Sequence, residues 1–491
     1  MIPLSLAEIA ALTGGRQHDI TESARTVTGP VVIDSRKAVP GSLFAAFVGE
    51  HVDGHDFAES ARAAGAAGVL ATRPPGGPAV VVDDMERALG ALARHLVAEL
   101  GTRVVALTGS SGKTSTKDLI AQLLERLGPT VWPAGSQNNE IGLPLTALRA
   151  EADTRHLVLE MGARGVGHIR YLTELTPPQI GVVLNVGTAH LGEFGGREQI
   201  AQAKGELVEA LPPAAEGGVA VLNADDPYVR AMASRTRAAV LLFGESQEAE
   251  IRASDVRLTP AGTPSFTLHT PTGCGEVRLR LYGEHHVSNA LAAAAVAHQL
   301  GMPAREIAQA LSEAGTLSKW RMEVTRRADG VTVVNDAYNA NPDSTRAALR
   351  TLAAMGGTRA AALTEGDGAA EGGRTWAVLG EMAELGDEAL AEHDAIGRLA
   401  VRLNVSKLVA VGGREAGWLD MGAKNEGSWG EESVHVSDAE AAVDLLRSQL
   451  RPGDVVLVKA SRAVGLERVA EALLADDPAA GADAVTGGGA R

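Results

Sequence analysis

The residue types best suited to chemistry lie between a short apolar run, residues 103–107, and a helical pattern that starts at Lys113. A glycine-rich loop in this position directs backbone N–H groups and the positive end of the helix dipole at one point, where an anion binds. Lys113 adds a full positive charge, and Thr114 offers a hydroxyl to a phosphate-bound Mg²⁺. The residues predicted to bind phosphate are Thr108, Gly109, Ser110, Ser111, Gly112, Lys113, Thr114 and Ser115.

This loop is shorter than the common P-loop, because only Ser110 and Ser111 separate Gly109 from Gly112. A strand, two glycines, a lysine and a threonine nevertheless follow one another in the order that phosphate binding requires. The alternative is a strand-turn-helix unit with an incidental exposed lysine. We favour the phosphate loop.

Two further apolar runs end in residues that are candidates for holding a metal ion. Glu160 follows the run 156–159, and a carboxylate at the tip of a strand beside a phosphate loop suits a metal ligand. The alternative is a helix-capping or solvated glutamate. His190 follows the run 180–185 and is a candidate ligand for Mg²⁺ or phosphate, although a lone histidine is more often structural.

Lys204 lies on a predicted helix, residues 200–211, beside Ala201, Leu207 and Val208. A buried lysine loses its proton readily, and a neutral amine can react with CO₂ to give an anionic carbamate that ligates a metal. The residues alone favour the simpler alternative, a lysine that extends along the helix flank with its charge in water.

Several polar turns are candidate ligand contacts. Ser35 and Arg36 follow a predicted strand and suit a phosphate or a sugar nucleotide, or are ordinary surface-turn residues. His285 and Asn289 precede an alanine-rich helix at 290–300, where they either contact an adenine edge or cap the helix. An amide-rich turn suited to positioning a polar ligand contains Gln137, Asn138 and Asn139.

The composition narrows the class of protein. A chain of 491 residues predicts about three domains, and 45% hydrophobic with only 3% aromatic residues predicts cores of Ala, Val and Leu. The net charge of −16 argues against a nucleic-acid partner. The N-terminus has no basic segment of a signal peptide, no run is long enough to span a membrane, and Cys274 is the only cysteine. We therefore expect a cytoplasmic protein.

The predicted elements fall into three domains and a tail. Residues 1–98 form a small α/β domain that starts with a helix at Ser5–Thr13. Residues 99–314 contain the phosphate loop and a parallel sheet, with antiparallel strands expected over 251–282. Residues 315–475 alternate strands and helices, including a helix at Ser344–Ala354, which indicates a mainly parallel sheet. Residues 476–491 are rich in Ala, Gly and Asp and are expected to be disordered.

Several motifs occur in an order that resembles one family. They are TGSSGKTSTK, GSQNNEIGLP, EMGARGVGHI, NVGTAHLGEFG, AKGEL, GEHHVSNALAA and NDAYNANPDS, with DSR and GEHVDGHDF nearer the N-terminus. Together they resemble the ATP-dependent Mur ligase family of peptidoglycan synthesis, over the chain to about residue 475. The segment NDAYNANPDS is the most discriminating motif and is similar to that of the members that add D-alanyl-D-alanine to a UDP-N-acetylmuramoyl-tripeptide.

The resemblance implies a fold and a reaction. The fold is α/β in three domains: a small N-terminal α/β domain, a central P-loop-type domain with a parallel sheet, and a C-terminal Rossmann-like domain. The reaction is ATP-dependent amide-bond formation through an acyl phosphate. The implied cofactors are ATP and two Mg²⁺ ions, with Lys204 carbamylated. The implied partners are the UDP-linked tripeptide and D-alanyl-D-alanine, and we expect a monomer.

The resemblance also assigns roles to residues. Lys113, His190 and Lys204 are the expected catalytic residues, and Thr114, Glu160, His190 and Lys204 the metal ligands. Beyond the phosphate loop, the expected ATP contacts are His285, Asn289, Arg321, Asp336 and Tyr338. Substrate contacts are expected from Ser35, Arg36, Gln137, Asn138, Asn139, Asn339 and Asn341.

The chain departs from the family pattern in three places. His286 stands where an Asn is usual, Ala460 replaces the glycine of a Lys-Gly-Ser motif, and residues 356–374 resemble an insertion rich in Ala and Gly. Three other functions are alternatives: a ligase of the same fold that adds a diamino acid, a folylpolyglutamate synthase-like ligase, and a regulator that binds nucleotide without catalysis. The NDAYNANPDS segment disfavours the first two, and the set Glu160, His190 and Lys204 disfavours the third.

Overall fold

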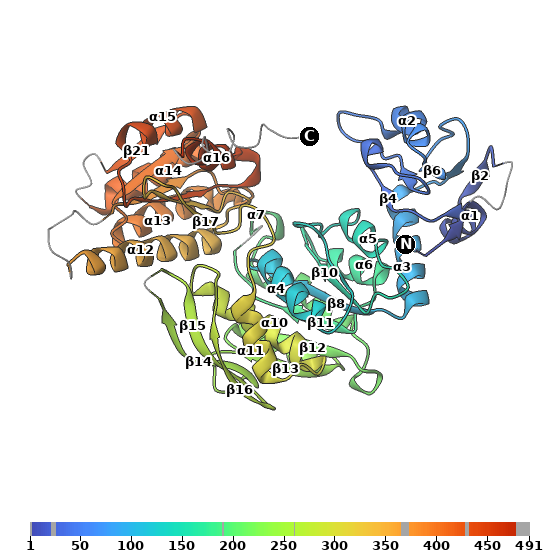
Figure 1. Cartoon of the computed structure of the whole chain (residues 1–491), viewed down its shortest axis with the longest axis horizontal. Coiled ribbons are helices and arrows are strands. Elements are labelled where there is room, and N and C mark those ends of the chain that lie inside the picture. The colour runs from blue at the N-terminus through green and yellow to red at the C-terminus, as the bar shows by residue number, and fades with distance from the viewer. Residues whose placement is uncertain are drawn as a thin grey trace, which may run out of the picture.

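The computed structural model describes residues 2–20, 26–188, 191–259, 261–364, 373–427 and 432–477 (Figure 1). Three larger sheets divide these residues in chain order, and a separate two-stranded sheet pairs β1 (Leu4–Ser5) with β3 (Thr26–Val27). In Figure 1 the N-terminal part, in blue, and the C-terminal part, in orange and red, lie on different sides of the central part.

The N-terminal sheet has the order β2-β7-β6-β5-β4, parallel except for β2. The predicted first helix is confirmed as α1 (Leu6–Thr13): Ser5 caps it, Glu8 completes the capping box, and Gly14 adopts the left-handed conformation that ends it. The other elements are β2 (Arg16–His18), β4 (Val31–Val32), β5 (Leu43–Ala45), α2 (Ala58–Ala63), β6 (Gly68–Ala71), β7 (Ala79–Val81) and α3 (Met85–Leu100).

The central sheet has nine strands in the order β16-β15-β14-β13-β12-β11-β8-β10-β9. From β9 to β14 in this order, neighbouring strands run parallel. The same sheet continues with β15, which is antiparallel to β14, and β16, which is antiparallel to β15, as predicted for this region. The strands are β8 (Arg103–Thr108), β9 (Thr130–Val131), β10 (His156–Glu160), β11 (Ile180–Val183), β12 (Val219–Asn223), β13 (Ala239–Gly244), β14 (Ile251–Leu258), β15 (Pro264–Thr270) and β16 (Gly273–Arg278).

Strand β8 lies between β10 and β11, so the polar residues that follow these three strands meet at one edge. The register pairs Glu160 with Leu107, and Val183 with Thr108. Ligands of open α/β sheets bind at this carboxyl edge. The topology therefore explains why the phosphate loop and Glu160 are neighbours.

Helices cover both faces of the central sheet, with the alanine-rich α10 buried against β13, β14 and α4. This helix begins at His285 rather than at residue 290, so the predicted start was wrong and His285 and Asn289 lie inside its first turns. The helices are α4 (Lys113–Glu125), α5 (Gly142–Ala147), α6 (His168–Leu175), α7 (Leu191–Phe194), α8 (Arg197–Glu209), α9 (Pro227–Ala231), α10 (His285–Gln299) and α11 (Ala304–Glu313).

The C-terminal sheet has the order β17-β18-β22-β19-β20-β21, with only β17 antiparallel. The elements are β17 (Glu323–Arg326), β18 (Thr332–Asn335), α12 (Pro342–Thr364), β19 (Thr375–Leu379), α13 (Ala389–Arg402), β20 (Lys407–Val411), α14 (Arg414–Glu426), β21 (Ser433–Val436), α15 (Ala439–Gln449), β22 (Val455–Lys459) and α16 (Glu467–Ala475).

Three expectations for this part need correction. Helix α12 is longer at both ends than the predicted Ser344–Ala354, and it continues into the segment interpreted as an insertion. Helix α14 and strand β21 were not predicted. Asp476 pairs with Arg447 at 2.8 Å, and Asp477 accepts a hydrogen bond from the Ala328 N–H, so these two residues of the expected disordered tail belong to the fold. The rest of that expected tail, residues 478–491, lies outside the described residues. None of the described helices is long and apolar enough to cross a membrane.

Candidate active site

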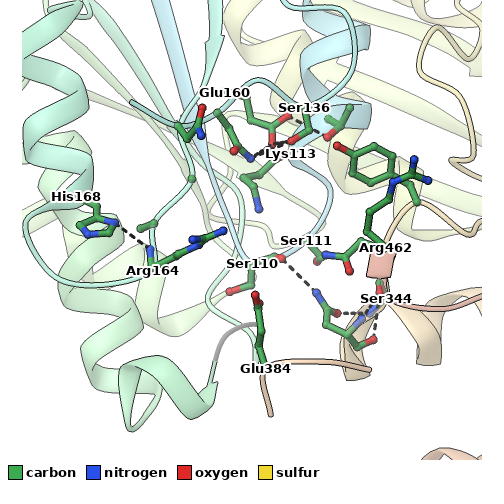
Figure 2. Close-up of a pocket in the computed structure, with 18 of the residues that line it drawn as sticks. Ser110, Ser111, Lys113, Ser136, Glu160, Arg164, His168, Ser344, Glu384 and Arg462 are labelled. Carbon is green, nitrogen blue, oxygen red and sulfur yellow. Dashed lines mark hydrogen bonds between the residues drawn. The ribbon is translucent and has the colours of Figure 1, made fainter. Parts of the chain in front are cut away.

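A cavity of about 730 Å³ lies between the central and the C-terminal parts of the chain. Figure 2 shows Lys113, Glu160 and Ser136 close together, with Ser344 and Arg462 approaching from a different part of the ribbon. Many of the predicted site residues line this cavity. They are Ser110, Ser111, Gly112, Lys113, Thr114, Asn138, Asn139, Glu160, Lys204, Arg321, Tyr338, Asn339 and Asn341.

The phosphate loop has the geometry that the sequence predicts. Gly112 has φ of 79°, and a Cβ there would lie 2.5 Å from Asn289 Oδ1, so this position requires glycine. Lys113 Nζ donates to the Gly109 carbonyl at 2.9 Å. Burial lowers the pKa of Lys113, with Glu160 acting in the opposite direction. Thr108 ends β8 and is buried, and neither it nor Ser115 is among the lining residues.

Asn185 was not selected from the sequence, yet it holds the loop in shape. Its Oδ1 accepts hydrogen bonds from the backbone N–H groups of Ser110 and Ser111 at 2.9 and 3.0 Å. Gly187 N–H donates to Ser110 Oγ at 2.9 Å. A polar residue directly after β11 was the available signal, since it lies at the same sheet edge as the loop.

Glu160 is almost fully buried and surrounded by donors. Its Oε2 accepts from Thr114 Oγ1 at 2.9 Å, and its Oε1 accepts from Ser136 Oγ at 2.8 Å and Asn138 Nδ2 at 2.7 Å. The predicted ligand His190 lies outside the described residues. Within the described ranges there is no group of three or more His, Cys, Asp or Glu side chains that could hold a metal. One carboxylate and one hydroxyl suit an ion that takes its remaining ligands from phosphate and water, as Mg²⁺ commonly does.

Lys204 is 5% exposed and lines the same cavity. Burial, and then the neighbouring charge of Lys113, hold its pKa well below the ordinary value. No described residue hydrogen-bonds to its Nζ. The apolar setting predicted for Lys204 is therefore confirmed, and the surface-exposed alternative is wrong.

The C-terminal part brings Arg321, Tyr338 and Asn341 to the phosphate loop. Arg321 Nη2 donates to Thr114 Oγ1 at 3.2 Å, and its guanidinium lies 4.0 Å over the Tyr338 ring. Asn341 Nδ2 donates to the Ser110 carbonyl at 3.4 Å. These contacts extend from one sheet to the next, so both parts complete the cavity.

Asp336 and His285 are close to the cavity but are not among its lining residues. Asp336 Oδ2 accepts a hydrogen bond from Lys459 Nζ at 2.7 Å, and the same amine donates to the Asn339 carbonyl at 2.9 Å. This pair therefore supports the segment that carries Asn339, a residue that lines the cavity. His285 stacks on His286 with ring centroids 4.2 Å apart, and burial lowers the pKa of His285 to about 4. Asn289 contacts Gly112 as described above.

Three predicted substrate contacts are not among the residues that line this cavity. Ser35 and Arg36 form a 3₁₀ turn in the N-terminal part, where Arg36 pairs with Asp34 at 2.8 Å. The Gln137 side chain accepts from Thr146 Oγ1 at 3.0 Å. Ser35 and Arg36 are therefore not brought to the cavity, whereas Gln137 lies between Ser136 and Asn138, which both contact Glu160, with its own side chain bonded to Thr146.

A phosphate loop lies at the carboxyl edge of a parallel sheet and faces a second α/β unit across a shared cavity. This arrangement defines a nucleotide-dependent enzyme whose active site is formed by more than one domain. Three family models match the chain: "Mur ligase family, catalytic domain" over residues 30–97, "Mur ligase middle domain" over 107–297, and "Mur ligase, glutamate ligase domain" over 320–462. The chain belongs to the Mur ligase family, and both the resemblance and the predicted three-domain α/β fold are confirmed.

The relatives narrow the type within the family. Proteins named UDP-N-acetylmuramoyl-tripeptide–D-alanyl-D-alanine ligase are 50% identical in Mycobacterium tuberculosis and 35% identical in Escherichia coli, covering 97% and 96% of this chain and 99% of each relative. MurF of Acinetobacter baumannii has a TM-score of 0.81 at 31% identity, covering 96% of this chain and 99% of that one. MurF of Thermotoga maritima, solved in complex with ADP, has a TM-score of 0.75 at 30% identity and covers 91% and 97%. The chain is of the MurF type.

Proposed function

We propose that this protein is an ATP-dependent ligase that adds D-alanyl-D-alanine to UDP-N-acetylmuramoyl-tripeptide in the synthesis of peptidoglycan precursors. The names of relatives that match nearly the whole chain support the substrates. The observation that carries the proposal is the single cavity in which Lys113 and Glu160 from one sheet meet Arg321 and Asn341 from another.

The chemistry requires an activated acid. A carboxylate is a poor acyl donor because its leaving group would be oxide. In the proposed reaction the acceptor carboxylate attacks the γ-phosphorus of ATP, which gives an acyl phosphate and ADP. The dipeptide amine then attacks the acyl carbon, and the amide and inorganic phosphate form with loss of the amine proton. The role of the protein is alignment and charge neutralisation.

The phosphate loop supplies that charge. The backbone N–H groups at the start of α4 and the Lys113 ammonium bind the phosphates, and Arg321 adds a second positive charge beside Thr114. Burial of Lys113 in the cavity strengthens its interaction with a phosphate, since the local dielectric is low. The C-terminal part therefore completes the site for the transferred phosphoryl group.

Thr114 and Glu160 are the described residues that would hold Mg²⁺, because their oxygens already lie within hydrogen-bonding distance of each other. Mg²⁺ neutralises the negative charge on the phosphates and orients them. Two ions, with His190 as a further ligand, remain our proposal. We also propose that Lys204 carries a carbamate, which would give a buried anion beside Lys113. Burial, which holds the pKa of the amine well below its ordinary value, and the lack of a hydrogen-bond partner among the described residues support this.

We propose domain boundaries at residues 1–98, 99–314 and 315–475, supported by the way the three larger sheets divide the chain. We place the protein in the cytoplasm as a monomer. A single cysteine suits a reducing compartment.

The test is ADP release from purified protein with ATP and Mg²⁺. We expect turnover only when the UDP-linked tripeptide and D-alanyl-D-alanine are both present, with pentapeptide product detected by mass spectrometry. Turnover with a diamino acid or with glutamate and a folate in their place would identify another ligase of this fold. Nucleotide binding without turnover under any of these conditions would indicate a regulator.

A further inference from the structure

The wall that the C-terminal part contributes to the cavity carries a second arginine, Arg462. It lies three residues after the end of β22 and begins a 3₁₀ turn, residues 462–464. Its guanidinium lies 4.3 Å over the Trp320 ring, and its Nη1 lies 3.1 Å from Glu467 Oε1. These two contacts use one face and one nitrogen of the group, and the side chain is 51% exposed.

The Trp320 ring and Glu467 hold the guanidinium in place, but they leave most of its N–H donors without a partner among the described residues. A guanidinium has five N–H donors in a planar fork. No described residue pairs with Nε or Nη2 of Arg462. A stacked arginine with free donors at the edge of a cavity is preorganised for a carboxylate, which it can bind through two parallel hydrogen bonds.

The other cations of the cavity have different positions. Lys113 and Arg321 contact the phosphate loop directly, through Gly109 and Thr114. Lys204 is buried. Arg164 follows β10 beside α6, the helix that packs on α3, and so lies on the side that leads to the N-terminal part. Arg462 lies across the cavity from Arg164 (Figure 2), and its contacts among the described residues are with Trp320 and Glu467 rather than with the phosphate loop.

The C-terminal carboxylate of the incoming dipeptide needs a hydrogen-bonding group of the protein. D-alanyl-D-alanine is a zwitterion whose amine must reach the activated carbonyl, while its carboxylate lies about 7 Å away at the other end of two residues. A buried carboxylate without a partner is costly. We propose that Arg462 binds this terminal carboxylate and thereby selects a dipeptide with a free C-terminus; this rests on the proposed function.

The experiment compares two substrates in two proteins. The substrates are D-alanyl-D-alanine and its C-terminal amide, and the proteins are the natural chain and Arg462→Gln. We expect the natural chain to lose about 10- to 100-fold in kcat/KM with the amide, because a hydrogen-bonded charge pair is lost. Arg462→Gln should show a similar loss, mainly as a raised KM, with the carboxylate substrate, and no further loss with the amide.

The matched control is Arg414→Gln. Arg414 also stacks on a tryptophan, 5.0 Å over Trp418, but it does not line the cavity, so its kinetics should be unchanged. The KM values for ATP and the UDP-linked tripeptide should not change in Arg462→Gln. Arg462→Lys, which keeps the charge without the fork, should fall between the natural chain and Arg462→Gln.

Two outcomes overturn the inference. One is an Arg462→Gln protein that still discriminates against the amide as strongly as the natural chain. The other is a raised KM for ATP with an unchanged KM for the dipeptide. If circular dichroism shows that Arg462→Gln does not fold, the same comparison of the carboxylate and amide substrates is made with Arg462→Lys, and the same two outcomes overturn the inference. Failure of the natural chain to use any D-alanyl dipeptide would instead refute the proposed function.

Discussion

Two buried lysines face the same cavity in different electrostatic settings. Lys113 donates to the Gly109 carbonyl and has the Glu160 carboxylate nearby, which favours its charged form. Lys204 has no carboxylate among the causes of its lowered pKa, and the charge of Lys113 lowers that pKa further. The two side chains therefore suit different chemistry: Lys113 suits binding of a phosphate, and Lys204 gives up its proton more readily and suits reaction as an amine.

The charge of Lys113 should be needed for turnover. We expect Lys113→Ala to reduce kcat by about 10²- to 10³-fold, as the loss of one preorganised charge contact does elsewhere. The measurement is steady-state ADP release with both substrates saturating. Lys319→Ala, on the exposed linker before Arg321, is the control and should be normal. A Lys113→Ala protein with near-normal rates would remove the loop from the mechanism.

The amine of Lys204 should react with CO₂. With ¹³C-bicarbonate we expect a carbamate signal in the ¹³C NMR spectrum that disappears in Lys204→Ala and persists in Lys424→Ala, where the lysine pairs with Asp420 on a helix surface. Lys204→Ala should be inactive and partly rescued by short carboxylic acids, which restore the anion. Absence of both the signal and the rescue would leave Lys204 unmodified.

At the scale of helices and strands, α4 connects the phosphate loop to the linker between two sheets. Lys117 is fully buried and donates to the Pro133 and Gly135 carbonyls, and Asp118 accepts from the Ser318 N–H at 3.1 Å. Gln122 exchanges two hydrogen bonds of 3.0 Å with Gly315. The helix that begins at the phosphates therefore also fixes the chain that leads to Arg321.

Helix α10 should make the fold sensitive to acid. Burial lowers the pKa of His285 to about 4 and that of His286 well below its usual range, so both rings are neutral in the folded state. Asp336 raises and Lys459 lowers the His285 value, and the helix N-terminus disfavours a cation. Unfolded histidines bind a proton near pH 6.5, so the free energy of unfolding falls as the pH drops from 6.5 toward 4.

For His285 alone the loss is on the order of 3 kcal/mol across that interval. Thermal unfolding between pH 4 and 8 checks it: His285→Gln should flatten the dependence, whereas His435→Gln, at an exposed site on β21, should not. An unchanged slope in His285→Gln would show that the ring does not contribute.

The strand–loop–helix unit around Lys113 was predictable because it depends on local signals: a β-branched run, glycines and helical spacing. The start of α10 was not, since His285 to Asn289 have no strong helix signal and are held by burial against the rest of the fold. Asn185, Ser136 and Arg462 were missed for a related reason. Their importance comes from the strand order, which brings segments far apart in the sequence to one edge, and no single segment carries that information.

At the scale of the whole molecule, three side-chain contacts near the phosphate loop add to those of α4 in joining the described C-terminal part to the central part. They are Arg321 to Thr114, Asn341 to Ser110, and Asp343 to Thr188. In the third, Asp343 Oδ2 accepts from both the N–H and the hydroxyl of Thr188, at 2.8 and 3.1 Å. Because Thr188 follows Gly187, which contacts Ser110, this carboxylate supports the phosphate loop from the far side of the cavity.

Asp343 should therefore stabilise the closed arrangement. We expect Asp343→Ala to lower kcat/KM about tenfold and to give a larger radius of gyration by small-angle scattering with nucleotide and both substrates bound. Asp438→Ala, which removes the N-cap carboxylate of α15 in the same domain, is the control. In a cycle with Thr188→Val the effects should be non-additive, with a coupling of about 0.5–3 kcal/mol. Additive effects and unchanged scattering would remove Asp343 from this role.

Trp320 lies on the linker between these parts, with the Arg462 guanidinium over its ring and its carbonyl accepting from Tyr338 N–H at 3.3 Å. Indole emission responds to a nearby cation and to solvent. Among the tryptophans that the structure describes, it is therefore the one placed to report domain movement and dipeptide arrival as separate changes in intrinsic fluorescence. Stopped-flow mixing could follow the order of substrate binding without any attached dye.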